Sequence, residues 1–567
     1  MAKWSTVVRV VCLLAMFARI SLQAAITSDT PDEDFYTAGV VEFYYNIDSD
    51  MNQAWSENLL GFLEIIGSEN ASATDIIVFP EATLNSQQTA TFVPEPKLLI
   101  VPCLDDPNAT YYHELLVRIS CAAREFSKYV VINVNEKQVC SENAQNDPRP
   151  CAPNDLNIYN TNVVFDRNGT VMSRYRKVHL YGEPRNTTYE QERVFFETDF
   201  GVTFGHFICF DILFYTPAHE LIVEADIRDF VFPSMWFSQL PFLTAVQFQH
   251  AWAYANNVNL LAAGASRPEV GSSGTGIYHG REGTLVSVLN MQEGEQRIYV
   301  ARVPKFKGRM TGSRRRTISA ALPRKISQAQ SFEESYIKLK RDSLENYENE
   351  PLELVATEAG NLTRQLCHGN FCCDFDIAWR PVMEQEATED LYSYRLGVYD
   401  GERNEQDVDN NYLRNCAIFT CTGPSIEQCG MMFESKGQSN VIFTRIVIEA
   451  AFPKSREFLL LPDSLREDLL PLEPSQFDWS TTEVGYYQFT RYSLHEGVEV
   501  PNLLTFAIYG NYYDDQCTFS GQLNAECGYI AQEDEPGGAS SLTLQLGGYW
   551  VVLGAALVVA RSCFAFV

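Results

Sequence analysis

Apolar residues recur in short runs between residues 35 and 305, and several runs are separated by segments with a helical pattern. Within residues 57–66 and 114–120, apolar positions lie three and four residues apart, which is typical of amphipathic helices. Because strands and helices alternate, the pattern predicts an α/β fold with buried strands. The turn Asp166-Arg167-Asn168-Gly169 between two apolar runs predicts a β-hairpin. Strands are expected at residues 40–44, 76–79, 129–134, 162–165, 204–210, 230–232 and 259–263.

The pattern changes after residue 305. The basic stretch Arg314-Arg315-Arg316 is followed by polar and acidic residues, and is expected to be a solvated surface segment rather than a processing site. Later in the chain, the runs 439–448 and 503–509 predict strands in a region rich in aromatic residues. We therefore expect one domain at residues 30–310, a connecting segment at 311–350 and a second, β-rich domain at 351–535.

The first residues have the pattern of a secretion signal. A basic residue, Lys3, is followed by an apolar stretch and by small residues around Ala24. The alternative is a membrane anchor, but the uncharged stretch between Arg9 and Arg19 is short for a bilayer, which needs about 20 apolar residues. A cleaved signal is therefore expected over residues 1–24.

The last residues combine small residues, a short polar spacer and an apolar tail. This is the pattern of a glycosylphosphatidylinositol signal over residues 536–567, with Gly538 as the expected attachment residue and the tail removed from about residue 539. A transmembrane helix that ends at Arg561 is the alternative. Both interpretations predict an extracellular protein at the cell-surface membrane, which could also be secreted.

The composition of the chain limits which molecules it can bind. Acidic residues outnumber basic ones by 73 to 43, and the formal net charge of −30 argues against nucleic acid, because a duplex repels such a surface. Five sequons are expected to lie on the surface of a secreted protein and to carry glycans. They are Asn70, Asn108, Asn168, Asn186 and Asn361.

The chain has fifteen cysteines, and secreted proteins oxidise their thiols in pairs. Without the two near the chain ends and Cys209, twelve remain, which predicts up to six disulfides. Cys140 and Cys151 flank a polar, proline-rich loop and are an expected pair. A second group of cysteines, with a histidine beside them, could bind zinc or form disulfides. Disulfides are favoured because the compartment is oxidising. That cluster is Cys367, His368, Cys372 and Cys373.

Three apolar runs each end at a chemically active side chain. Residues 78–80 lead to Glu81, the second arm of the hairpin leads to Lys177, and residues 207–208 lead to Cys209. Since ligands of α/β sheets bind at the carboxyl ends of strands, the three could meet in one pocket. Each alone has an ordinary explanation: a helix-capping carboxylate, a solvated ammonium and a core thiol.

The sequences around these residues resemble a known pattern. Phe79-Pro80-Glu81, the segment 175–183 and the segment 207–212 resemble the Glu, Lys and Cys motifs of the nitrilase superfamily. Further segments are similar to its vanin/biotinidase branch, namely 209–214, 232–236, 240–241, 250–253, 258–262 and 274–278. The resemblance implies a four-layer αββα sandwich followed by a β-rich base domain stapled by disulfides.

The resemblance also implies hydrolysis of a secondary amide through a thioester. Cys209 would be the nucleophile, and Lys177 would hold it ionised, stabilise the oxyanion and act as proton donor. Glu81 would accept the thiol proton, pass it to the departing amine and later activate water. No metal or cofactor is required for this chemistry.

Other residues near the three motifs have supporting roles in this interpretation. Glu183 is expected to orient Lys177, and Asp211 to anchor the turn that holds Cys209. His179 and Trp236 are expected in the walls of the pocket.

The resemblance makes pantetheine the expected substrate, cleaved to pantothenate and cysteamine. Biotin amides are the alternative, because the segment 265–268 departs from vertebrate vanins near the expected pocket mouth. A catalytically silent surface protein on the same scaffold is a second alternative, which the complete set of Glu81, Lys177 and Cys209 disfavours. A Cys/His protease is disfavoured because no Cys-Gly-Ser-Cys-Trp-like signature surrounds Cys209.

Overall fold

The structure is a computed structural model of the chain, which divides into two compact units, Met1–Tyr513 and Asp514–Val567. The described residues are 32, 34–47, 50–105, 111–143, 145–306, 326–328, 337–354, 357–382, 390–403, 411–433, 437–513, 543–546 and 549–552. The expected secretion signal, Asn108 and Gly538 therefore lie outside the described residues. The second unit holds an antiparallel pair, β27 (Thr543–Leu546) and β28 (Tyr549–Val552). Among the residues that were described, none of the helices combines the length and apolar character needed to cross a bilayer.

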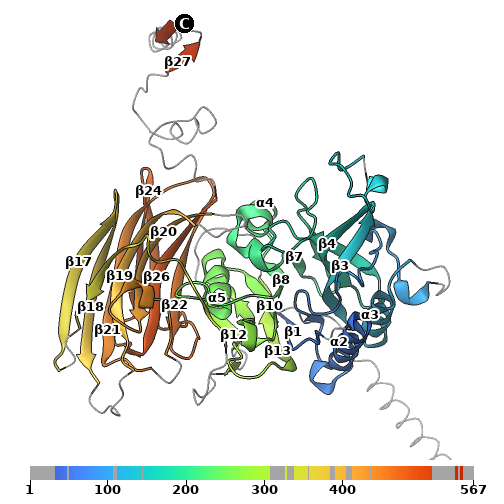
Figure 1. Ribbon diagram of the computed structural model, residues 1–567, viewed down its shortest axis with the longest axis horizontal. Helices are drawn as coiled ribbons and strands as arrows, with labels where there is room; N and C mark the ends of the chain where they lie inside the picture. Colours follow the sequence, from blue (N-terminus) through green and yellow to red (C-terminus); the bar gives the residue numbers. More distant parts are fainter. Residues whose placement is uncertain are drawn as a thin grey trace, which may run out of the picture. The chain divides into compact units, whose positions relative to one another are not determined.

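Two sheets form the centre of the first half of the chain (Figure 1). One has the order β13 (Gln296–Pro304), β1 (Phe35–Phe43), β2 (Ile76–Val78), β3 (Tyr129–Val139), β4 (Leu156–Phe165) and β5 (Val171–Arg176). The other has the order β6 (Phe195–Glu197), β7 (Thr203–His206), β8 (Asp229–Ser234), β10 (Asn259–Ala265), β11 (Thr275–His279), β12 (Gly283–Val288) and β14 (Ile326–Gln328). The sheets join where β1 pairs with β10, at Glu42–Gly264 and Phe43–Ala265.

Alternating side chains along the strands build the layers. In β2, Ile76 and Val78 lie in the core between the two sheets, whereas Ile77 packs with Leu59 and Leu115 of the covering helices. Those helices are α2 (Met51–Ile66) and α3 (Glu114–Glu125), and α4 (Glu220–Ala225) and α5 (Ala245–Asn256) pack on the second sheet. Successive side chains along a strand thus face two different cores. This arrangement confirms the expected αββα sandwich.

Helix α5 is buried on nearly every side. Only Tyr254 and Ala255 of its twelve residues are not fully buried. A helix that is covered all round shows no clear polar face, which is why its sequence pattern is less informative than that of α2 or α3. One side of α5 meets the second sheet, and the other meets β22 (Phe458–Arg466) of the C-terminal region.

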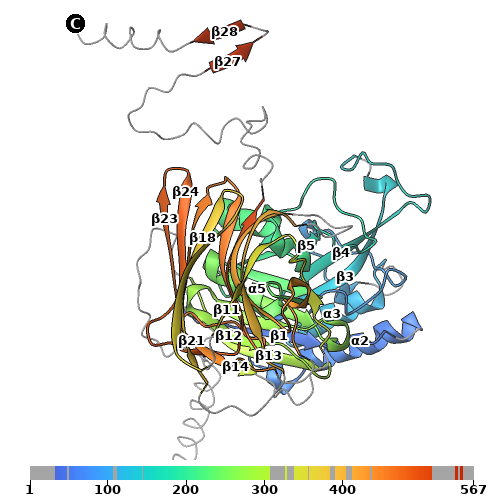
Figure 2. The ribbon, with the colours of Figure 1, turned by 60° about the vertical axis from the view of Figure 1, so that its left-hand side comes forward.

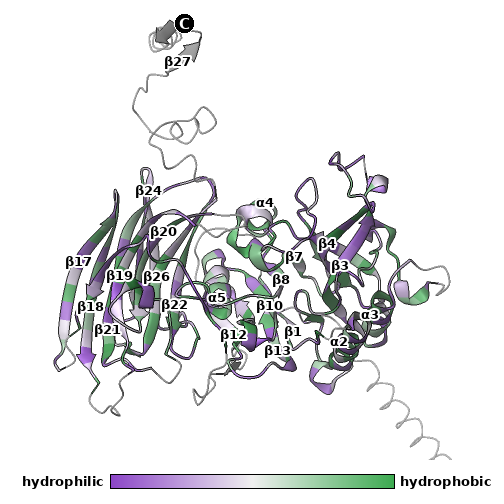
Figure 3. Cartoon of the chain, viewed as in Figure 1, coloured by the Kyte–Doolittle hydropathy of each residue, from purple (hydrophilic) through white to green (hydrophobic). Residues whose placement is uncertain are grey.

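The C-terminal region is a sandwich of two antiparallel sheets. The first has the order β16 (Glu348–Leu352), β19 (Ser393–Glu402), β20 (Tyr412–Cys421), β26 (Leu503–Tyr512) and β22. The second has the order β17 (Gly360–His368), β18 (Phe371–Pro381), β21 (Val441–Pro453), β24 (Tyr487–Leu494) and β23 (Phe477–Val484), with β25 (Val500–Pro501) paired to β21. Hydrophilic and hydrophobic bands both occur along β17 at the sheet edge (Figure 3).

Disulfides hold both halves of the chain, and five form within the described residues. The expected pair Cys140–Cys151 is confirmed. Cys373–Cys416 joins the two sheets of the C-terminal sandwich, because Cys373 is in β18 and Cys416 in β20. The others are Cys103–Cys121, Cys367–Cys372 and Cys421–Cys429. The cysteines of the possible zinc cluster are therefore consumed as disulfides.

The described part of the connecting segment packs against the αββα sandwich. β15 (Lys340–Arg341) pairs in parallel with β9 (Gln239–Leu240), and the backbone N–H of Asp342 donates to the carbonyl of Leu240 at 2.7 Å. Further along, Thr505 donates to the carbonyl of Pro241 at 2.8 Å. The C-terminal sandwich and the loop 235–243 therefore share a hydrogen-bonded contact.

The expected strand at residues 204–210 is wrong in its second half. β7 ends at His206, and Cys209–Leu213 form a short 3-10 helix. The apolar residues 207–210 are buried in the core although they are not in a strand, so apolar character alone predicted the wrong backbone. The other expected strands and both expected helices are present, some with extended bounds.

Candidate active site

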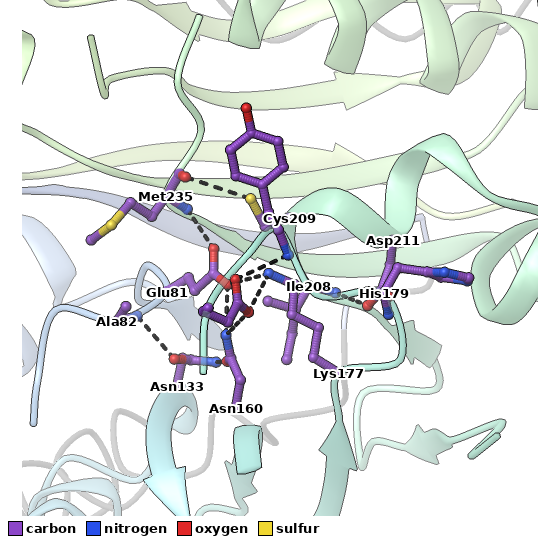
Figure 4. A network of polar contacts seen from close by, with 12 residues as sticks. Glu81, Ala82, Asn133, Asn160, Lys177, His179, Ile208, Cys209, Asp211 and Met235 are labelled. Carbon is purple, nitrogen blue, oxygen red and sulfur yellow. Dashed lines mark hydrogen bonds and ion pairs between the residues drawn. The ribbon is translucent and has the colours of Figure 1, made fainter. Parts of the chain in front are cut away.

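Glu81, Lys177 and Cys209 come together beyond the ends of strands from both sheets, as Figure 4 shows. Glu81 follows β2 by three residues, Lys177 follows β5 directly and Cys209 begins the short helix after β7. Their exposed fractions are 3%, 1% and 6%, so all three act in a site that is nearly closed to solvent. The strand ends therefore bring together the three residues that the sequence indicated.

Lys177 is held by two carboxylates. Its Nζ lies 2.8 Å from Oε1 of Glu81 and 2.8 Å from Oε1 of Glu183. Burial opposes the positive charge, but the two carboxylates outweigh burial and raise the pKa of Lys177 well above its usual value. The ammonium is therefore permanently charged at neutral pH, and Glu183 contacts Lys177 as expected.

Two asparagines that the sequence did not single out complete this arrangement. The amide nitrogen of Asn160 donates to Glu81 at 2.7 Å and to Glu183 at 3.0 Å. The amide of Asn133 in turn donates to the Oδ1 of Asn160 at 2.7 Å. Both lie inside strands, and a buried asparagine within an apolar strand run was the available signal. The pair orients the carboxylates without adding charge.

The backbone of Met235 joins the carboxylate to the thiol. Its N–H donates to Oε2 of Glu81 at 2.8 Å, and its carbonyl accepts from Sγ of Cys209 at 3.5 Å. Met235 follows β8 directly, so a further strand end of the second sheet contributes to the site. A backbone contact of this kind has no sequence signature.

The backbone at Cys209 is held in an unusual conformation. Its φ of +47° lies in the left-handed region, which costs of order 1–3 kcal/mol for a residue other than glycine. Asp211 holds this turn, because its carboxylate accepts from the N–H groups of Ile208 and His179 at 2.9 Å each and from the phenol of Tyr175 at 2.7 Å. The expected anchoring role of Asp211 thus has a geometric basis.

The surroundings of Cys209 favour the neutral form of its thiol. Burial and the negative charge of Glu81 raise the pKa of Cys209 well above its usual value, although Lys177 acts in the opposite direction. The charge of Lys177 is shared by two carboxylates, and burial and Glu81 act against ionisation of the thiol, so the expectation that Lys177 holds Cys209 ionised stays a prediction. The thiol must lose its proton during attack.

His179 and Trp236 are tied to the protein framework. The ring of His179 stacks on Phe214 at 3.8 Å and its Nε2 lies 3.1 Å from the carbonyl of Thr216. Trp236 donates from its indole nitrogen to the carbonyl of Leu243 at 2.8 Å. Neither residue lines the cavity of about 250 Å³ beside Gln239 and Lys340, so their place in a pocket wall stays a prediction.

Lys340 reaches the site from the connecting segment. Its Nζ donates to the phenol oxygen of Tyr181 at 2.9 Å and lies 5.2 Å from the ring centre of Phe237. The N–H of Tyr181 donates to Oε2 of Glu183 at 3.1 Å. A residue beyond the catalytic sandwich therefore contacts the loop that carries Glu183.

Among the described residues, one group has the donors and spacing of a metal site. It consists of Cys140, Cys151 and Asp155, but its two sulfurs are bonded to each other. The four described sequon asparagines, Asn70, Asn168, Asn186 and Asn361, all have exposed side chains, and their glycosylation stays a prediction.

Comparisons with known proteins find relatives that cover nearly the whole chain. The family model described as Carbon-nitrogen hydrolase matches residues 49–267, and the model described as Vanin C-terminal domain matches residues 337–516. Vanin-like protein 1 of Drosophila melanogaster is 56% identical over 99% of this chain and 98% of its own length.

More distant relatives are named for an activity. A biotinidase of Takifugu rubripes is 33% identical over 63% of this chain and 71% of its own length, and the human pantetheine hydrolase VNN2 is 28% identical over 77% and 78%. The solved structure of Saccharomyces cerevisiae Nit3, a member of branch 10 of the nitrilase superfamily, is 15% identical with a TM-score of 0.35, covering 48% of this chain and 90% of that chain. Because of the two family models and the 56% identity to Vanin-like protein 1, the chain belongs to the vanin family of carbon–nitrogen hydrolases, and it is a hydrolase that acts on amide carbon–nitrogen bonds.

Proposed function

We propose that the protein is an extracellular amidohydrolase that cleaves pantetheine to pantothenate and cysteamine through a thioester on Cys209. The observation that carries the proposal is the buried network in which Glu81 contacts Lys177 directly and Cys209 through the backbone of Met235. It combines a nucleophile, a proton acceptor and a fixed positive charge, and so has the groups that hydrolysis of an unactivated amide needs.

The first half of the reaction forms the thioester. Glu81 takes the proton of Cys209 as Sγ attacks the amide carbon, which avoids a free thiolate in a site where burial raises the pKa of Cys209. The carbonyl oxygen becomes negative, and Lys177 supplies a charge that needs no proton transfer to act. Glu81 then gives its proton to the amine nitrogen, the carbon–nitrogen bond breaks and cysteamine leaves.

The second half regenerates the thiol. A water molecule takes the place of the departed amine, and Glu81 accepts one of its protons as the oxygen attacks the thioester carbon. The carbon–sulfur bond breaks, the proton returns to Sγ, and pantothenate leaves. One water is consumed and the site returns to its starting protonation state.

Biotin amides are the second candidate substrate. The relatives include a biotinidase of Takifugu rubripes as well as the human pantetheine hydrolase. Arg267, in the segment that departs from vertebrate vanins, lies 5.2 Å from the ring centres of both Tyr44 and Tyr45 and is paired with Glu269 at 2.7 Å. Turnover of the two substrates decides between them.

The proposed location follows from the two ends of the chain. A secretion signal over residues 1–24 and a lipid-anchor signal over 536–567 would place the mature protein on the outer face of the cell membrane. The disulfides support an oxidising compartment. Release of cell-bound protein by phosphatidylinositol-specific phospholipase C tests the anchor.

The test of the reaction compares pantetheine and biocytin turnover by the full chain. We expect cysteamine release from pantetheine, its loss in Cys209→Ser with an unchanged melting temperature, and a pantothenyl mass adduct on Cys209 under rapid acid quench. Wild-type rates in Cys209→Ser would exclude this nucleophile. Faster turnover of biocytin than of pantetheine would instead establish the biotin amide as the substrate.

A further inference from the structure

The hairpin between β23 and β24 can be followed in Figure 2. It carries four exposed hydrophobic side chains, here called the hairpin tip. Val484, Tyr486, Tyr487 and Phe489 are 57%, 61%, 47% and 48% exposed. Val484 and Tyr487 are direct neighbours in the strand register, and Phe489 lies two residues further along the same strand. Such a group on one hairpin marks an interaction surface rather than scattered exposure.

The first compact unit ends beside the hairpin tip. Pro453 pairs with Tyr487 in the register of β21 and β24, and the phenol of Tyr512 donates to the carbonyl of Pro453 at 2.8 Å. The N–H of Tyr513 then donates to the carbonyl of Glu457 at 2.8 Å. The chain therefore leaves this unit at the same end of the C-terminal sandwich as the hairpin tip.

We propose that the hairpin tip contacts the outer leaflet of the membrane to which the protein is anchored; the inference rests on the proposed surface location. Tyrosine rings suit the bilayer interface because an apolar body and a polar hydroxyl face different media. The expected attachment residue, Gly538, lies 25 residues beyond Tyr513, which spans about 90 Å at most. The tether thus keeps the hairpin tip within reach of the bilayer.

The partner is a neutral bilayer of phosphatidylcholine. The protein's formal net charge of −30 opposes approach to an anionic surface. Contact through Val484 and Phe489 depends on the burial of apolar surface, which salt does not screen. Binding is therefore expected to be insensitive to ionic strength and weaker when anionic lipid is added.

The experiment is flotation of the full-chain protein with phosphatidylcholine vesicles. The protein is taken from the medium or released from cells by phospholipase C, so that no lipid tail contributes. We expect wild-type protein to float, and Tyr486→Ser combined with Phe489→Ser to bind at least tenfold less at an unchanged melting temperature and turnover. The matched control is Tyr189→Ser, a change at a 55% exposed tyrosine of the catalytic half, which should bind as wild type.

A second readout locates the contact. In Tyr486→Trp, the indole emission should shift to shorter wavelength on addition of vesicles, and bromine-labelled lipid should quench it. Flotation no greater for wild type than for the double variant would overturn the inference. So would light scattering that shows a wild-type dimer and a monomeric double variant, because the hairpin tip would then be a contact between copies. If the wild-type protein did not turn over pantetheine at all, the proposed reaction would be refuted. The flotation result would still stand.

Discussion

The Nζ of Lys177 lies 2.8 Å from Oε1 of Glu81 in a site where both side chains are almost fully buried. Glu183 contacts the same nitrogen, so the ionised site has two negative charges and one positive charge. Burial and the negative charge of Glu81 raise the pKa of Cys209 well above its usual value, although Lys177 opposes them, so the thiol favours its neutral form. The reactivity of Cys209 therefore depends on how strongly Lys177 is paired with Glu81 and with Glu183.

Glu183→Gln should separate thiol reactivity from turnover. Besides burial and Glu81, Glu183 raises the pKa of Cys209, and it also holds Lys177, so its neutralisation lowers that pKa while it loosens the ammonium. We expect alkylation of Cys209 by iodoacetamide to become faster near pH 8, and kcat to fall by about 10- to 100-fold. An unchanged pH profile of alkylation would contradict this electrostatic role. The control is Glu197→Gln, a change at an exposed carboxylate, which should leave both measurements as in wild type.

Asp211→Asn should disturb the turn that presents Cys209. An amide nitrogen cannot accept the hydrogen bonds that Asp211 receives from Ile208, His179 and Tyr175, and at least one buried donor loses its partner. The free energy of unfolding should fall by about 1–3 kcal/mol, and kcat should fall with it. Tyr175→Phe leaves the N–H groups of Ile208 and His179 paired. Besides the bond from the phenol to Asp211, it removes only the longer bond from the N–H of Val178 to the phenol at 3.3 Å, so it should cost less in denaturant unfolding and turnover. Equal effects of the two changes would show that the hydrogen bonds from the N–H groups of Ile208 and His179 do not stabilise the turn.

Glu42→Gln should change how stability depends on pH. Burial raises the pKa of Glu42 from 4.5 to about 7, although Ser273 and Thr275 donate hydrogen bonds to it. The folded protein therefore keeps a proton that the unfolded chain has released, so the stabilisation is complete below pH 4.5 and is lost as the pH rises to about 7. The loss amounts to about 3 kcal/mol.

Melting temperatures between pH 4.5 and 8 check this prediction. The glutamine variant should match wild type at the acid end and exceed it at pH 8, because its neutral side chain has no proton to lose. Asp229, with its pKa raised by burial to about 6, keeps part of the slope in both proteins. Parallel curves for the two proteins would refute the assignment to Glu42.

Lys340→Met should affect catalysis from outside the catalytic sandwich. Lys340 is exposed, and its contacts with Tyr181 and Phe237 are of the kind worth about 0.5–1 kcal/mol. We expect kcat to fall about two- to fivefold with KM and melting temperature nearly unchanged, because Tyr181 helps to place Glu183. Lys340→Arg, which can donate to the same phenol, should restore kcat. A fall in melting temperature without a change in kcat would indicate a purely structural contact.

The sequence pattern predicted those features whose physical cause lies in neighbouring residues of the chain. The alternation of strands and helices predicted the αββα layers, and the turn at Asp166–Gly169 joins β4 to β5 as expected. Cys140 and Cys151 could be paired because only a short polar loop separates them. The apolar run through Cys209 misled, since Asp211 captures the backbone there and ends the strand at His206.

The sequence by itself determined which residues stand at the strand ends, because the order of apolar runs along the chain decides that Glu81, Lys177 and Cys209 follow strands. Only the tertiary structure decided how their charges combine. Asn160, the backbone of Met235 and Lys340 come from distant segments, and their contacts depend on two sheets and a connecting segment meeting in space. The pKa of Cys209 is likewise decided by the tertiary structure, because burial and neighbouring charge exist only in the folded protein.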